Sequence, residues 1–193
     1  MRPEYHIIRK PYQNGVYCGD AGLVKQDGDT LFLAVIDGLG HGKKAQDAAQ
    51  SCICFLEAHH RNGLTWLAEA VHRHIRGSRG AVAALCRIDT KKKNFSCVSV
   101  GDITVRRLNN ERFRICSRPG ILGYQARSFK QETRQLAVGD ILLMHTDGIS
   151  SHFTPKDLDG LLEGDARCIA ENIMARYEKL HDDSLCIVVR CLK

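Results

Sequence analysis

The order of apolar and polar residues in the first part of the chain predicts a β-hairpin followed by two helices. Val16 to Val24 and Thr30 to Ile36 read as strands around the turn Gln26-Asp27-Gly28-Asp29, and an Asp-Gly pair between such runs is a strong hairpin signal. Apolar residues then recur every three or four positions in two segments, Lys43 to His60 and Leu64 to Ile75. This spacing is typical of amphipathic helices.

The rest of the chain has the pattern of short strands, with helices near its end. The strands are predicted to form an antiparallel meander, at Ala81 to Ile88, Phe95 to Val100, Ile103 to Leu108, Arg112 to Cys116, Phe129 to Leu136 and Asp140 to His145. Thr154-Pro155-Lys156-Asp157 resembles a helix start with Thr154 as N-cap, and Asp165 to Glu178 has a helical period. Ser184 to Leu192 is an apolar strand suited to a sheet interior.

This succession of strands and helices favours a layered α+β fold, in which antiparallel sheets are covered by helices on their outer faces. Parallel βαβ winding would require strands and helices in regular alternation, which the central segment lacks. No repeat or linker divides the 193 residues. We therefore expect residues 1–193 to form a single domain.

Composition narrows the class of protein. Apolar residues make up 44% of the chain and charged residues 26%, which predicts an ordinary globular protein rather than a disordered one. The sequence has no signal-peptide pattern and no apolar run long enough for a membrane span. Nine scattered cysteines without a Cys-x-x-Cys motif indicate buried apolar side chains in a reducing, cytoplasmic compartment. A zinc site is the alternative, but Cys52 and Cys54 lack a second pair.

The net charge of +6 raises the possibility of nucleic-acid binding. However, Lys91-Lys92-Lys93 lies between two apolar runs, as a charged hairpin tip would. Aromatic residues make up only 6% of the chain, which is little for stacking on bases. We therefore expect no nucleic-acid partner, and the positive charge suits a phosphorylated protein equally well.

Aspartates at the ends of apolar strands are the candidate functional residues. The strand ending at Ile36 runs into Asp37, three glycines and a helix, the strand ending at Thr146 runs into Asp147-Gly148, and Asp182-Asp183 precedes the last strand. Carboxylates are the hard oxygen ligands that Mg²⁺ and Mn²⁺ prefer, and two such ions commonly activate water against a phosphate. The alternative is that each Asp-Gly pair marks a turn, as Asp27-Gly28 does.

Several stretches resemble the type 2C metal-dependent protein phosphatases, and in particular their short bacterial SpoIIE-like branch. They occur in the family order over nearly the whole chain: Gly19-Asp20, Ala34 to Gly42, Arg79 to Ala83, Val100 to Ile103, Ser117 to Gly123, Gly139 to Ile149 and Asp182 to Val189. The resemblance implies a four-layer αββα sandwich of two antiparallel sheets flanked by helices. It also implies two Mn²⁺ or Mg²⁺ ions as cofactors.

The resemblance assigns roles to individual residues. Asp37 would bridge both metals, the Gly38 carbonyl would ligate one ion, and Asp147 and Asp182 would complete the other shell. Asp20 would hold metal-bound water, and Asp183 is interpreted as a turn residue. Asp102 matches a position that binds a third ion in some relatives, but Ser151 stands where a further acidic residue is expected, which argues against a third site. Neither Arg2 nor Arg9 matches the phosphate-gripping arginine of the large eukaryotic members.

The expected reaction is attack on phosphoserine or phosphothreonine by a metal-activated water, without a covalent enzyme intermediate. His41 is either the acid that protonates the leaving oxygen or a solvent-facing residue at a helix start, and His145 is interpreted as a satisfied core histidine. The implied substrates are phosphorylated STAS-domain proteins of a stressosome, dephosphorylated as negative feedback on a bacterial stress response. The alternatives are a partner-switching phosphatase acting on an anti-anti-sigma factor and a non-catalytic phosphoprotein-binding module. We expect a monomer.

Overall fold

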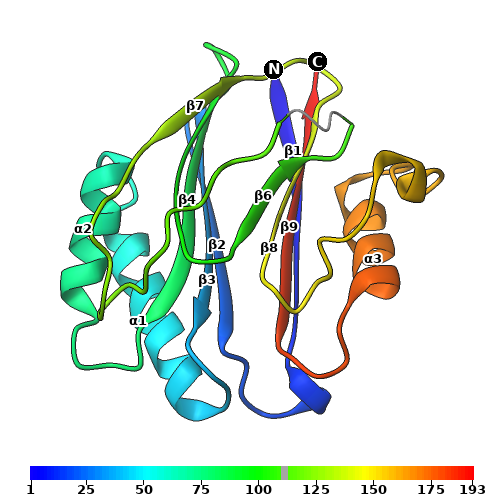
Figure 1. The fold of residues 1–193 in the computed structure, drawn as a ribbon. Helices are drawn as coiled ribbons and strands as arrows, with labels where there is room; N and C mark the ends of the chain where they lie inside the picture. Colours follow the sequence, from blue (N-terminus) through cyan, green and yellow to red (C-terminus); the bar gives the residue numbers. More distant parts are fainter. Residues whose placement is uncertain (110–112) are drawn as a thin grey trace.

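Two antiparallel sheets form the centre of the molecule (Figure 1). The computed structural model describes residues 1–109 and 113–193. One sheet has the order β1 (Arg2–Lys10), β9 (Ser184–Leu192), β8 (Ile141–His145) and β6 (Thr104–Arg107). The other has the order β2 (Asp20–Asp27), β3 (Thr30–Gly38), β4 (Ala81–Asp89), β5 (Asn94–Val100) and β7 (Glu132–Gln135).

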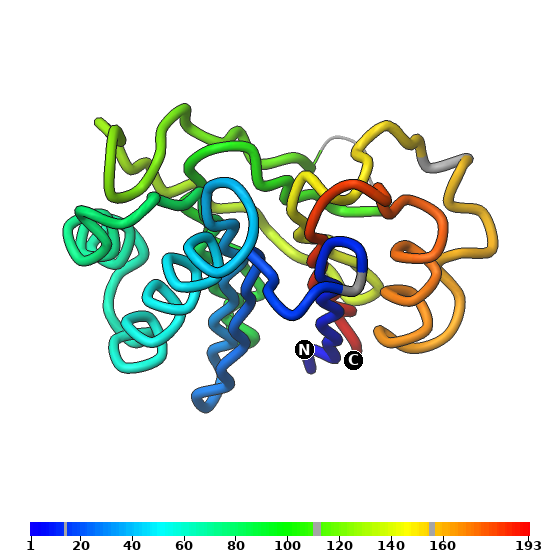
Figure 2. The backbone as a smooth tube through the Cα atoms, turned by 90° about the horizontal axis from the view of Figure 1, so that it is seen from below, coloured from blue at the N-terminus to red at the C-terminus, as the bar shows by residue number. Residues whose placement is uncertain are grey.

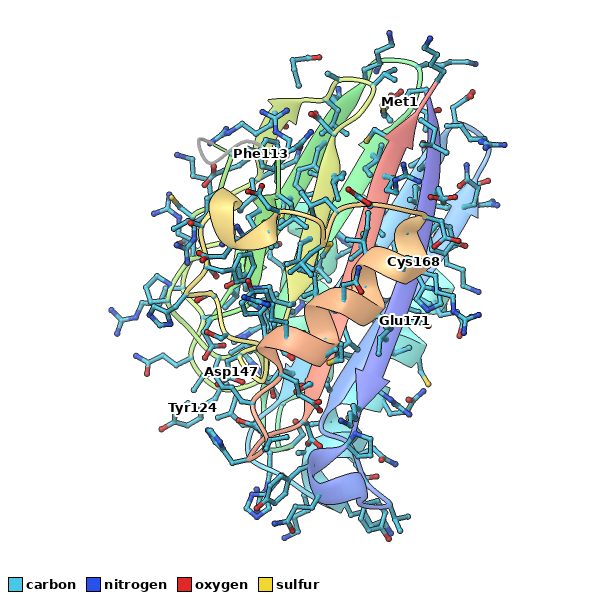
Figure 3. The ribbon with its side chains drawn as sticks, turned by 90° about the vertical axis from the view of Figure 1, so that its right-hand side faces the viewer. Met1, Phe113, Tyr124, Asp147, Cys168 and Glu171 are labelled. Atoms are coloured by element: carbon cyan, nitrogen blue, oxygen red, sulfur yellow. The ribbon has the colours of Figure 1, made fainter. Side chains whose placement is uncertain are left out.

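Helices cover the outer face of each sheet. Helices α1 (Lys43–His59) and α2 (Leu64–His74) pack on the five-stranded sheet, and α3 (Ala166–Tyr177) packs on the four-stranded sheet (Figures 1 and 3). Two short 3-10 helices, η1 (Tyr12–Asn14) and η2 (Pro155–Leu158), lie in the connections. The layers therefore follow the order αββα, and the expected α+β sandwich is confirmed. None of the described helices is long and apolar enough to cross a membrane.

The position of β3 between two cores explains why its sequence is almost continuously apolar. Leu33 and Val35 belong to the core between the two sheets, whereas Ala34 and Ile36 belong to the core beneath α1 and α2. Successive side chains of a strand point to opposite faces, so a strand with both faces covered needs apolar residues at every position. A third core lies between α3 and the four-stranded sheet and includes Val188.

The predicted meander is wrong, because consecutive strands of the central segment belong to different sheets. Strand β5 pairs with β7, and β6 pairs with β8. Alternating apolar residues predict a strand and its buried face, but they do not specify which strand lies beside it. The three α-helices and β9 lie where they are predicted, within one residue at each end. The hairpin of β2 and β3 is also present, but β2 ends three residues and β3 two residues later than predicted.

Other boundaries also differ from the predictions. Strand β2 begins at Asp20 rather than Val16, which is exposed, and β1 was not predicted at all. The strand predicted for residues 129–136 is limited to β7. Of the strand predicted at 112–116, Arg112 lies outside the described residues, and the remainder makes only an isolated bridge through Arg114. Thr154 precedes a single 3-10 turn and donates its N–H and hydroxyl to Asp157.

The strand ends that carry the aspartates meet at one end of the sandwich, away from the chain termini. Figure 2 views this end from below, with the connections 11–19, 39–42 and 178–183 in front. Asp147 lies toward this end, and Met1 lies at the other (Figure 3). Antiparallel pairing places Asp20 opposite Asp37, although 17 positions separate them in the chain.

Candidate metal centre

Five of the predicted site residues, four aspartates and His41, line a single cavity of about 500 Å³. Asp37 is supplied by the end of β3, Asp102 by the connection after β5, Asp147 by the connection after β8, and Asp182 by the residues just before β9. The fold therefore brings together carboxylates that are far apart in the sequence. The cavity is also lined by Tyr12, Leu39, Gly40, His41, Val82 and His181.

Two glycines next to these aspartates are required by close packing rather than by a positive φ, although Gly148 lies in a turn closed by the Ile149 N–H, which donates to the Thr146 carbonyl oxygen. A Cβ atom on Gly38 would overlap the carbonyl oxygen of Ala45 at the start of α1, and one on Gly148 would overlap that of Asp183. Neither glycine has a positive φ, whereas Gly28 in the β2–β3 turn has φ +55°. The turn interpretation therefore holds for Asp27-Gly28 but not for Asp37-Gly38, which lies within β3.

Asp20 is a buried carboxylate that joins the two sheets. The Thr146 hydroxyl donates to Asp20 Oδ2 at 2.6 Å, and the Leu185 N–H donates to the Thr146 oxygen at 3.0 Å. Asp20 is 2% exposed and is not among the described residues that line the cavity. Sequence reasoning missed Thr146, because a single hydroxyl beside an aspartate is not a specific signal.

The interpretation of Asp183 as a turn residue is wrong. Its carboxylate accepts hydrogen bonds from the N–H groups of Tyr12, at 2.8 Å, and Gly19, at 2.7 Å. Asp183 is therefore buried and ties the connection between β1 and β2 to the start of β9. Asp182 is half-buried and lines the cavity, so it is the member of the pair that faces a possible ion.

The convergence of carboxylates changes their acidity. Burial, reinforced by the charge of Asp37, raises the pKa of Asp20 from 3.8 to about 8, against the hydrogen bond from Thr146. Burial, followed by the charges of Asp147 and Asp102, raises the pKa of Asp37 to the same level. The pKa of Asp147 is raised by burial and then by Asp182. A divalent cation would relieve this repulsion because it favours the ionised form of each carboxylate.

The donor set fits Mg²⁺ or Mn²⁺. Its side-chain donors are carboxylate oxygens, which these hard cations prefer over nitrogen or sulfur. Within residues 1–109 and 113–193, no three Asp, Glu, His or Cys side chains are grouped tightly enough to hold an ion by themselves.

The raised pKa values predict that the stability of the metal-free protein falls as the pH rises. Asp20 and Asp37 retain protons in the folded state that the unfolded chain releases near pH 3.8. Their contribution to the free energy of unfolding is therefore full below that pH and is lost by about pH 8. We expect the metal-free Tm to fall between pH 5 and about pH 9, and the increase in Tm on adding Mg²⁺ to be larger at the higher pH. Calorimetry with and without chelator measures both; an equal increase at both pH values would contradict the assignment.

Asp182 and Asp183 are expected to respond differently to the same substitution. Asp182→Asn should weaken Mn²⁺ affinity with little effect on the metal-free Tm, because its side chain lines the cavity. Asp183→Asn should destabilise the protein by about 1–3 kcal/mol, because the new amide group cannot accept one of the two backbone hydrogen bonds. Metal titration and thermal unfolding of both variants test this, and the reverse pattern would exchange the two roles.

The histidines occupy different environments. His41 is exposed and lines the cavity just before α1, and His181, which sequence reasoning missed, lines the same cavity. His145 is buried, its Nδ1 lies 2.8 Å from the Thr146 carbonyl oxygen, and burial lowers its pKa to about 4. Its Nε2 has no hydrogen-bond partner among the described residues. The prediction of a satisfied core histidine is therefore correct for one ring nitrogen and wrong for the other.

Two face-to-face antiparallel sheets, outer helices and aspartates gathered at one end define a PP2C-type phosphatase fold. The chain belongs to the Stage II sporulation protein E (SpoIIE) family, whose profile matches residues 27–191. The fold, the family and the PP2C-type phosphatase class predicted from the sequence are confirmed.

Comparison with individual proteins identifies RsbX as a relative, by sequence and by structure. The chain is 25% identical over 174 residues to phosphoserine phosphatase RsbX of Bacillus subtilis (strain 168), covering 89% of this chain and 86% of RsbX. The structure of RsbX in complex with magnesium superposes with a TM-score of 0.85 at 22% identity, covering 97% of this chain and 94% of that one.

Two further structures share the fold. A chain solved in work on the bacterial stressosome as a modular system has a TM-score of 0.89 and 35% identity, covering 98% of this chain and 100% of that one. The PP2C phosphatase domain of SpoIIE from Bacillus subtilis has a TM-score of 0.79 at 19% identity, covering 99% of this chain and 64% of that chain.

Proposed function

We propose that this chain is a metal-dependent phosphoserine/phosphothreonine protein phosphatase that uses two Mn²⁺ or Mg²⁺ ions. The observation that carries the proposal is the meeting of Asp37, Asp147 and Asp182 in one open cavity. Asp37 would bridge the ions, the Gly38 carbonyl would ligate one of them, and Asp147 and Asp182 would hold the other. RsbX, a relative by sequence, has been solved with magnesium.

The residues of the chain would position and protonate the reactants. When bound, the ions supply an activated water and offset charge on the phosphoryl group. Strand β3 holds Asp37 in register opposite Asp20, and the Thr146 hydroxyl holds Asp20. His41, exposed beside the cavity, would donate a proton to the leaving serine or threonine oxygen. Asp102 lines the same cavity. Ser151 stands where a third ion would need a further carboxylate, so the proposal includes two ions only.

A cysteine nucleophile is not part of this proposal. Cys18 is the cysteine nearest in sequence to Asp20, and burial raises its pKa to about 12, so it stays a thiol at neutral pH. None of the cysteines lines the cavity within the described residues. All nine are free, which supports a reducing compartment such as the cytoplasm.

The proposed substrates are phosphorylated STAS-domain proteins of a stressosome, and the proposed role is negative feedback on a stress response. Two relatives support this choice: the 35% identical chain comes from work on the bacterial stressosome, and RsbX is a phosphoserine phosphatase. The proposal takes the chain to act as a monomer on one phosphoprotein at a time.

Intact-mass measurement of substrates tests the proposal. The protein is incubated with phosphorylated STAS-domain proteins and Mn²⁺ or Mg²⁺, with chelator as the control. We expect metal-dependent loss of the phosphoryl group. Turnover of an aryl phosphate without turnover of any STAS protein would reject the substrate class, and turnover of neither would leave a phosphoprotein-binding module.

A further inference from the structure

A second pocket, of about 590 Å³, adjoins the metal cavity. The two share Asp102 and Asp147, so a ligand centred on the metal cavity can extend into the second pocket. Arg114, Lys179 and His145 also line it. None of these three residues has a role in the proposed phosphoryl transfer.

Arg114 and Lys179 give this pocket positive charge. The backbone of Arg114 bridges to β6, and the N–H of Lys179 donates to the Gly148 carbonyl oxygen at 2.8 Å, which fixes Lys179 beside Asp147. Neither side chain forms an ion pair with a carboxylate in the described part of the chain. Both cations are therefore available to a ligand.

The negative charges of the pocket lie where it meets the metal cavity. Asp102 and Asp147 line both spaces, and cations bound in the metal cavity would offset their charge. Arg114 and Lys179 line the second pocket but not the metal cavity. With metal bound, this pocket favours an anionic ligand.

His145 provides a second, independent indication of a ligand. A carbonyl oxygen only accepts, so the contact with the Thr146 carbonyl requires the proton to be on Nδ1 of the neutral ring. Nε2 is then an acceptor, and it lacks a donor among the described residues although His145 is only 1% exposed. His145 therefore contributes an unpaired, enclosed acceptor to the wall of the pocket.

We propose that this pocket binds the substrate chain beside the phosphorylated residue and selects an acidic side chain there through Arg114 and Lys179. The proposal rests on the proposed phosphatase function, because a phosphoryl group in the metal cavity places the adjoining residues at this pocket. A substrate residue spans about 3.3 Å when extended, so the acidic residue lies within a few positions of the phosphoserine.

Phosphoserine peptides that differ at one flanking position test the proposal. Glu, Gln and Lys are placed in turn at each of the nearest positions, and kcat/KM is measured from phosphate release with saturating Mn²⁺. We expect about a fivefold preference for Glu over Gln at one position, which is the size of a partly exposed charge pair. Arg114→Gln should lower this ratio, because only Lys179 then remains, and Arg114→Glu should shift the preference toward Lys.

Arg73→Gln is the matched control, because it removes the same charge from the exposed surface of α2. It should keep the wild-type ratio. A reversed preference in Arg114→Glu cannot result from partial unfolding, which lowers all rates together. Equal rates for the three wild-type peptides, or an unchanged ratio in Arg114→Gln, would overturn the proposed pocket while hydrolysis continues. No metal-dependent hydrolysis of any peptide or of an aryl phosphate would instead reject the phosphatase function itself.

Discussion

Asp37→Asn is expected to abolish metal-stimulated hydrolysis of an aryl phosphate while raising the stability of the metal-free protein. Loss of the carboxylate proposed to bridge the ions should lower activity by more than about 100-fold, since even residues that only support metal ligands are worth 10–100-fold. The same change removes one negative charge from a group in which burial and neighbouring aspartates hold the pKa at about 8. At a pH above 8 the metal-free variant should therefore unfold at a higher temperature than the wild type.

Asp147→Asn should repeat the loss of activity, because Asp147 lines the same cavity. Asp47→Asn, on the exposed side of α1, is the matched control and should change neither activity nor Tm appreciably. Initial rates in a Mn²⁺ series, circular dichroism and calorimetry at two pH values provide the measurements. Retained activity in a folded Asp37→Asn protein would exclude Asp37 as the bridging ligand. A lower metal-free Tm would show that its carboxylate stabilises the fold.

Gly148→Ala is expected to cause the largest loss of stability. The added Cβ would overlap the backbone carbonyl of Asp183 and lie 2.6 Å from the Ser184 hydroxyl oxygen. The backbone of Gly148 cannot move away easily, because its carbonyl accepts from the Lys179 N–H and the Ser184 hydroxyl. Overpacking of this kind costs about 1–3 kcal/mol or more, so Tm should fall by roughly 5 °C or more.

The affinity for Mn²⁺ should fall together with Tm. Gly148 follows Asp147 directly and packs against the backbone of Asp183, which is next to Asp182. Gly63→Ala is the matched control: its Cβ meets open space and its φ of −60° suits alanine. Thermal unfolding and Mn²⁺ titration of both variants distinguish overpacking from the general effect of replacing glycine. Equal values of Tm for the two variants would contradict the close approach of the strand ends.

The metal centre illustrates what local sequence can predict. Asp37 and Asp147 each follow an apolar strand, and this pattern identified them as candidates before their positions were known. Thr146 and His181 carried no comparable signal, because a single hydroxyl or imidazole has many uses. The choice between Asp182 and Asp183 also needed coordinates, since adjacent residues in extended chain point in opposite directions.

The sequence by itself determined the α-helices, most strands and the candidate carboxylates, because hydrophobic period and strand-end position are properties of neighbouring residues. Only the tertiary structure decided that β6 and β8 belong to the four-stranded sheet, that Asp183 holds the connection after β1, and that Arg114 and Lys179 line the pocket beside the metal cavity. These features join residues distant in the chain, and their partners are chosen by packing of whole layers rather than by local pattern.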